Sequence, residues 1–190
     1  MPASVFPTGT TIFNPDKCWN GYTLFPAEGT TQLIDMNGNM VNSWQGLSGF
    51  PTKMLPNGDI MGTSGRRVAL RYAKNGDNSD LLQVNWDGNI VWEFNRYELV
   101  EGRGAEPAWT ARWHHDYQRD GNPVGYYVPG TDSLVDSGNT LILCHKNVKK
   151  PAISNTPLWD GTIIEVTWDG EIIWEWICSD HFDEMAFSAE

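Results

Sequence analysis

The stretch LQVNWDGNIVWEF (residues 82–94) decides the fold. Polar and apolar residues alternate on both sides of its central Asp-Gly pair, and this period of two is typical of a half-buried β-strand. Asp-Gly or Asn-Gly between two such runs indicates a tight hairpin, because a type I′ turn needs a positive φ at both central residues. The stretch therefore predicts two antiparallel strands joined by a short turn.

The same pattern occurs three times in the chain. LIDMNGNMVNSW (33–44) and IEVTWDGEIIWEW (164–176) align with the first stretch without gaps. Aromatic residues, mostly tryptophan, recur in the strands of these hairpins, and the whole chain has ten tryptophans. A repeat unit too small to have its own core buries apolar area against the next unit, so we expect these tryptophans to pack between repeats.

A further strand pair precedes each of the later hairpins. In the second repeat it is GFPTKMLPNGDIMGT (49–63), and in the third it is HHDYQ (114–118) followed, after an insertion, by GNTLILCHK (138–146). Four strands per unit with a glycine turn per hairpin is the pattern of a β-propeller blade, and helical periodicity is rare. The sequence predicts an all-β fold, with residues 1–190 as a single partial propeller and insertion loops at 121–137 and 147–160 on the binding face.

The number of repeats is too small for a closed ring. The chain supplies about two and a half to three blades, with residues 181–190 as the opening strand of the next, whereas propellers close with four to eight blades. An open ring would leave long, tryptophan-rich edges in water. We therefore expect a second polypeptide to complete the ring, either a cleavage product of the same precursor or a separate subunit. The alternatives are a fragment or several copies forming one ring.

Composition narrows the class of protein. The net charge of −11 offers no basic stripe for a phosphate backbone, so nucleic acid is not an expected partner. The chain has neither 18 consecutive apolar residues nor a secretory signal, which predicts no membrane span and a cytoplasmic location, or a periplasmic or secreted one if a signal was removed. The three cysteines lie far apart and favour free thiols.

The four histidines all fall outside the tryptophan-bearing hairpins. The first strand of a blade lines the central channel. His114 and His115 open that strand in one blade, His181 opens it in the next, and Lys53 or Thr52 takes a similar place in the blade before. Because successive strand residues face opposite ways, we expect one of the adjacent pair to face the channel and the other to pack between blades. The candidate catalytic residues are His114, His115 and His181.

Three motifs resemble the arylsulfotransferase family: the hairpins ending in WDGxIxWEW, the HHD followed by GNTLIL, and the opening PTGTTIF with GYTLF. The resemblance covers nearly the whole chain and corresponds to the N-terminal half of such a protein. It implies a six-bladed propeller that moves a sulfuryl group between phenols through a transiently sulfated histidine, with no metal in the chemical step. Further channel histidines and an arginine bind the sulfate.

By motif, the resemblance places His114 and His115 among the channel histidines and makes His145, with Asn147, a candidate for substrate binding. The arginine and the nucleophilic histidine of the family tend to come from later blades. Within this chain, Tyr117, Lys53 and Arg112 are further substrate-binding candidates, since they can donate hydrogen bonds or pair with an anion.

Two other functions remain open at the level of sequence. Asp180, His181, Asp183 and Glu184 form an acidic cluster that would repel a sulfate ester but would suit a divalent metal. His181, Asp183 and Glu184 would then be ligands of a metal-dependent hydrolase or lyase that acts on an aromatic substrate. The third alternative is a non-catalytic propeller that serves as a binding or assembly module.

Overall fold

The computed structural model describes residues 12, 14–49, 51–65, 77–96, 112–121 and 134–185, and these form three antiparallel sheets. The first sheet contains β1 (Thr23–Ala27), β2 (Thr30–Ile34) and β3 (Met40–Gln45). The second contains β4 (Lys53–Met54), β5 (Ile60–Gly62), β6 (Leu81–Val84) and β7 (Ile90–Phe94). The third contains β8 (Arg112–Arg119), β9 (Thr140–Val148), β10 (Leu158–Val166) and β11 (Ile172–Ile177), and a short 3₁₀ helix, η1 (Cys178–Met185), follows it. The predicted all-β class is confirmed.

All three predicted hairpins are present, as β2–β3, β6–β7 and β10–β11. Their turn type differs from the expected type I′. Gly38, Gly88 and Gly170 have a positive φ, but among the described non-glycine residues only His115 does. The amide of each turn glycine donates to the carbonyl three residues earlier, and the strand register shifts beside each turn. These features indicate a type I turn closed by a glycine bulge, which needs only one left-handed residue.

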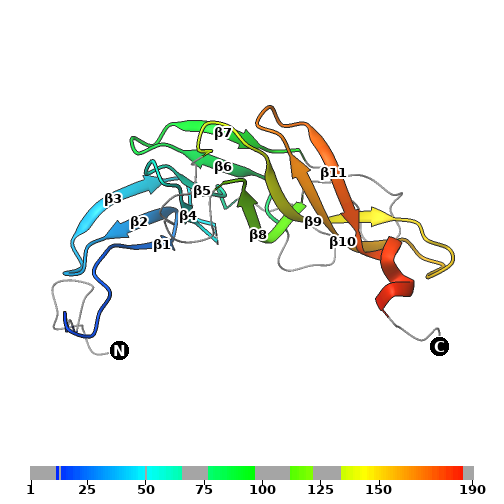
Figure 1. The fold of residues 1–190 in the computed structure, drawn as a ribbon, viewed down its shortest axis with the longest axis horizontal. Helices are drawn as coiled ribbons and strands as arrows, with labels where there is room; N and C mark the ends of the chain where they lie inside the picture. The colour runs from blue at the N-terminus through cyan, green and yellow to red at the C-terminus, as the bar shows by residue number, and fades with distance from the viewer. Residues whose placement is uncertain are drawn as a thin grey trace.

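The sheets pack in the order of the chain, with the second sheet between the other two (Figure 1). Leu33 and Trp44 of the first sheet share a buried apolar cluster with Leu82 of the second. Met61 and Trp92 of the second sheet share another with third-sheet residues. All four residues of β6 are buried, because both faces of this strand are covered. The core of the protein thus lies between sheets, where the strand period of two sends alternate side chains to opposite faces.

Side chains of β3 and β7 bind the hairpin turn of the next sheet. The amide of Asn42 donates to the Trp86 carbonyl at 2.8 Å, and the indole of Trp92, at the same repeat position, donates to the Trp168 carbonyl at 2.7 Å. Trp44 adds an edge-on ring contact with Trp86 at 5.6 Å between centroids. The predicted packing of tryptophans between repeats is confirmed for Trp44 and Trp92, which are buried.

Two predicted boundaries differ from the structure. The insertion loop at 147–160 is shorter, because β9 continues to Val148 and β10 begins at Leu158. The segment from 181 onward does not open a strand, since residues 178–185 form η1, while residues 186–190 lie outside the described part. The Asp160 carboxylate accepts the amide hydrogen of Ser179, and the His181 ring stacks on Trp176 at 4.9 Å, so the chain turns back onto β11. Most of the predicted loop at 121–137 also lies outside the described residues.

No helix among the described residues is long and apolar enough to cross a membrane.

Candidate functional site

The histidine cluster is built around a distortion of the edge strand β8. Trp113 pairs with Cys144 and Tyr117 pairs with Ile142, so three residues of β8, 114–116, lie opposite Leu143 alone. His115 accommodates this bulge with a φ of 60°, a left-handed conformation that is rare for a residue with a side chain. The predicted strict alternation of His114 and His115 does not hold, because the bulge breaks the period of two.

The bulge brings His114 against His145 of β9. Their rings stack with centroids 3.8 Å apart, and the ring of His115 meets His114 edge-on at 5.0 Å. The ring of His145 also contacts Trp159 of β10, with ring centroids 4.4 Å apart. His145 does not end its strand as expected, since β9 continues for three residues beyond it. Three of the four histidines therefore form one cluster on the third sheet.

A carboxylate from the second sheet orients His145. Nδ1 of His145 lies 2.9 Å from Oδ2 of Asp77, which is buried just before β6. A carboxylate at Nδ1 favours the tautomer that carries its proton there and leaves the lone pair on Nε2. The same carboxylate would also stabilise a positive charge on the ring. His145 therefore has the surroundings of a base or a nucleophile.

His114 is held in the neutral form. Burial lowers its pKa to about 4, and the neighbouring charge of His145 adds to the shift, while Asp77 opposes it. Within the described residues, neither ring nitrogen of His114 has a hydrogen-bond partner of normal geometry, and both are inaccessible to water. A buried polar group without a partner is costly, and such groups often mark functional sites.

Lys53 of β4 and Tyr117 of β8 connect the edge strands of the second and third sheets. The Lys53 ammonium donates to the Asp116 carboxylate and to the Tyr117 carbonyl. The Tyr117 hydroxyl donates to the Met61 carbonyl at 2.7 Å, and burial raises the pKa of this phenol well above its usual value. Tyr117 is 2 % exposed, so the structure gives it a packing role in place of the predicted contact with substrate.

The remaining substrate-binding candidates lie close to His145 in the sheet. Arg112 is its direct partner in the β8–β9 register, and the side chain of Arg112 lies outside the described residues. Asn147 is buried two residues further along β9 and pairs with Trp159. Both positions are thus consistent with a role beside the histidine cluster.

His181 is separate from this cluster. It lies in η1, where Nδ1 is 3.0 Å from Oε1 of Glu184 and the ring stacks on Trp176. Asp180 pairs with Lys150 instead of with the histidine. In the described ranges no three His, Cys, Asp or Glu side chains are grouped so as to hold a metal ion, and this includes His181, Asp183 and Glu184.

Sequence reasoning missed the residues that complete the cluster. Asp77 is 68 positions away from His145 and belongs to no recognisable motif. Trp159 falls in a segment expected to be a loop, although it lies in β10. The sequence of this strand, LWDGTIIEV (158–166), does not alternate between apolar and polar residues, so it gave no period-two signal for Trp159.

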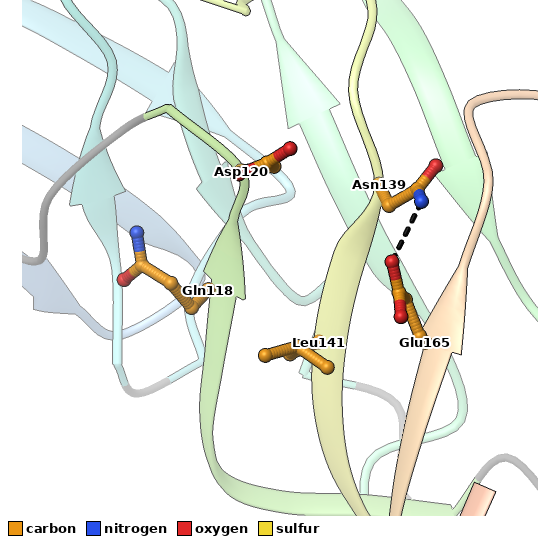
Figure 2. Close-up of a pocket in the computed structure, with 5 residues that line it drawn as sticks. All are labelled: Gln118, Asp120, Asn139, Leu141 and Glu165. Atoms are coloured by element: carbon orange, nitrogen blue, oxygen red, sulfur yellow. Dashed lines mark hydrogen bonds between the residues drawn. The ribbon is translucent and has the colours of Figure 1, made fainter. Parts of the chain in front are cut away.

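A separate hollow of about 200 Å³ lies on the third sheet and does not include the histidines. It is lined by Gln118, Asp120, Asn139, Leu141 and Glu165. Figure 2 shows these side chains over β8, β9 and β10, with Asn139 bonded to Glu165.

Comparison with protein-family models, with curated proteins and with solved structures gives no match to this chain.

Proposed function

We propose that the chain is part of a β-propeller enzyme of the arylsulfotransferase-like class, acting on a phenolic small molecule at the histidine cluster. The observation that carries the proposal is the arrangement of His145, which is bonded to the buried Asp77 and stacked on the neutral ring of His114. Nucleophilic catalysis by histidine uses a ring oriented in this way, with a carboxylate bonded to one of its nitrogens.

In this proposal His145 Nε2 attacks the sulfur of an aryl sulfate, and the S–O bond to the phenol oxygen breaks as the N–S bond forms. The donor leaves as a phenolate. Asp77 stabilises the positive charge that the ring acquires. An acceptor phenol then attacks the sulfur, the N–S bond to Nε2 breaks and the phenolic proton passes to water, while the stacked ring of His114 keeps His145 in place. No metal is needed for either step.

The propeller itself is supported by the serial packing of the three sheets and by the repeated bond from β3 and β7 to the next turn. A ring of four or more such sheets needs additional ones, so we assign the missing sheets to a second polypeptide. The non-catalytic alternative shares this architecture, and the metal-dependent alternative would use His181, Asp183 and Glu184.

Transfer from 4-nitrophenyl sulfate to phenol tests the proposal, measured on the native protein together with any polypeptide that purifies with it. We expect His145→Ala to abolish release of nitrophenolate and Asp77→Asn to slow it by roughly 10- to 100-fold, the usual cost of losing an orienting partner. The matched control is His181→Asn, which should keep full activity. A chelator should have no effect.

Other outcomes identify the alternatives. Loss of turnover on chelation, or in His181→Asn, would favour the metal-dependent enzyme. Binding of phenols without any turnover would favour the binding module. Full activity in His145→Ala would remove the histidine cluster from the chemistry.

A further inference from the structure

Equivalent cross-strand rows run over the second and third sheets. In the second sheet, one row of cross-strand partners consists of Lys53, Met61, Gln83 and Trp92, one residue from each strand. The row of the third sheet pairs Gln118, Leu141, Glu165 and Trp174 at the same positions. Each row is on the face turned away from the preceding sheet.

The row of the second sheet is covered by the third sheet. Met61 and Gln83 are each 1 % exposed, and Trp92 is 6 % exposed. Gln83 Nε2 donates to the Asp59 carboxylate in its own sheet and to the Val135 carbonyl of the third-sheet segment, both at 2.7 Å. The interface thus combines apolar burial with a donor from the row and a carbonyl acceptor from the next sheet.

The row of the third sheet is open. Leu141 is 43 % and Trp174 is 45 % exposed, and the hollow in Figure 2 lies over the same row. Glu165 occupies the place of Gln83, and Asn139 occupies that of Asp59. The bond between these two positions is kept with donor and acceptor exchanged, because Asn139 Nδ2 donates to Glu165 Oε1 at 2.6 Å.

We propose that this face of the third sheet binds a further antiparallel sheet of the same repeat, carried by a different polypeptide. A turn carbonyl of that sheet accepts the Trp174 indole hydrogen, as the Trp168 carbonyl accepts that of Trp92. Opposite Glu165 the partner presents an N–H group or a cationic side chain. A carboxylate can only accept hydrogen bonds, so the carbonyl that suits Gln83 would be repelled here.

A second copy of this chain fits the face less well. Each copy carries a net charge of −11, which opposes self-association and favours a partner with basic groups. This docking surface rests on the propeller assignment of the proposed function, but not on the chemistry of the histidine cluster.

A chain lengthened by one sheet tests the surface. A second copy of residues 112–185, with Trp174→Phe in the added copy so that its peptides differ in mass, is joined after Glu190. The added copy offers the Val135 carbonyl to Glu165, so Glu165→Gln in the original part should recreate the arrangement of Gln83. Hydroxyl-radical labelling with mass spectrometry reports the exposure of the original Trp174.

We expect labelling of Trp174 to fall about sevenfold in the lengthened Glu165→Gln chain, the ratio of 45 % to 6 % exposure for Trp174 and Trp92. With Glu165 unchanged the fall should be smaller. In the 190-residue chain, Glu165→Gln should leave the labelling unchanged. Hydrogen exchange in the added copy shows whether it has folded. A second lengthened chain, in which residues 51–96 are added in place of residues 112–185, repeats the test with a different sheet.

Three results would overturn the inference. One is unchanged labelling of Trp174 beside a folded added sheet. Another is failure of both added sheets to fold on this face, because the face should act as their template. The third is protection of Trp174 in the 190-residue chain as its concentration rises, which would make a second copy the occupant. None of these results bears on sulfuryl transfer.

Discussion

The two faces of the third sheet differ in chemistry. The second sheet covers one face, and among the described residues no sheet covers the other. Toward the second sheet, β8 directs Arg119, which is 2 % exposed and lies between the rings of Trp92 and Trp168, at 4.7 Å and 4.8 Å. Burial lowers the pKa of this guanidinium to about 10, and the two indole faces offset part of the desolvation cost. On the open face, Glu165 and Asp120 are acidic. The covered face is thus cationic and aromatic, while the open face is acidic.

Trp92 and Trp174 occupy equivalent positions, but Trp92 is on the covered row and Trp174 is on the open one. Replacing each by alanine should give the largest difference in the free energy of unfolding. Trp92→Ala should lower the free energy of unfolding by about 3–5 kcal/mol, because it leaves a cavity between two sheets and frees a bound carbonyl. Trp174→Ala should cost less than about 1 kcal/mol, since a half-exposed side chain has little burial to lose. Urea unfolding of both variants measures the difference. Equal losses would mean that Trp174 is already covered in this chain.

Exchanging the polar residues of the two rows gives a second test of the comparison. Gln83→Glu places a carboxylate at a 1 % exposed position against Asp59 and the Val135 carbonyl, and should lower the free energy of unfolding by about 2–4 kcal/mol at neutral pH. Glu165→Gln should change it by less than about 0.5 kcal/mol, because water reaches this position. Urea unfolding again supplies both values. A tolerated Gln83→Glu would show that the covered row is wetter than its burial indicates.

Much of the covered architecture could be predicted from the sequence, because hairpin signals are local. The Asp-Gly and Asn-Gly pairs located all three hairpins, and the alternating aromatics indicated which strands pack between sheets. The turn type was wrong because the same dipeptides also suit a type I turn with a glycine bulge. Sequence reasoning did not indicate the contrast between Gln83 and Glu165, since their roles depend on the strand register.

The candidate site was harder to predict, because its contacts are not local. Strand alternation was expected to separate His114 from His115, but the bulge with its left-handed His115 breaks the period. Asp77 meets His145 only after two sheets have packed. His181 was expected to open a strand, yet the bond from Ser179 to Asp160 turns the chain into η1. These events depend on tertiary packing, which no single window of the sequence contains.

The smallest effect is expected from acid, which should lower the free energy of unfolding through protonation of His114. The pKa of His114 is lowered by burial from 6.5 to about 4, so between these values the unfolded chain binds a proton that the folded chain does not. Stability contributed by the neutral ring is therefore present above pH 6.5 and is lost as the pH falls toward 4. Between pH 7 and pH 5 the loss is less than about 2 kcal/mol, the full value at 1.36 kcal/mol per pH unit, because solvent screens part of the shift of this half-buried ring.

His114→Phe should remove this part of the pH dependence, because a phenyl ring keeps the stacking on His145 and takes up no proton. Urea unfolding at pH 7 and pH 5 gives the change for each protein, and the difference between wild type and variant isolates His114 from all other titrating groups. His181→Asn, in η1 and outside the cluster, should retain the wild-type dependence. An identical acid loss in His114→Phe would place the sensitive group elsewhere, and the stacked pair would then be more hydrated than its buried nitrogens indicate.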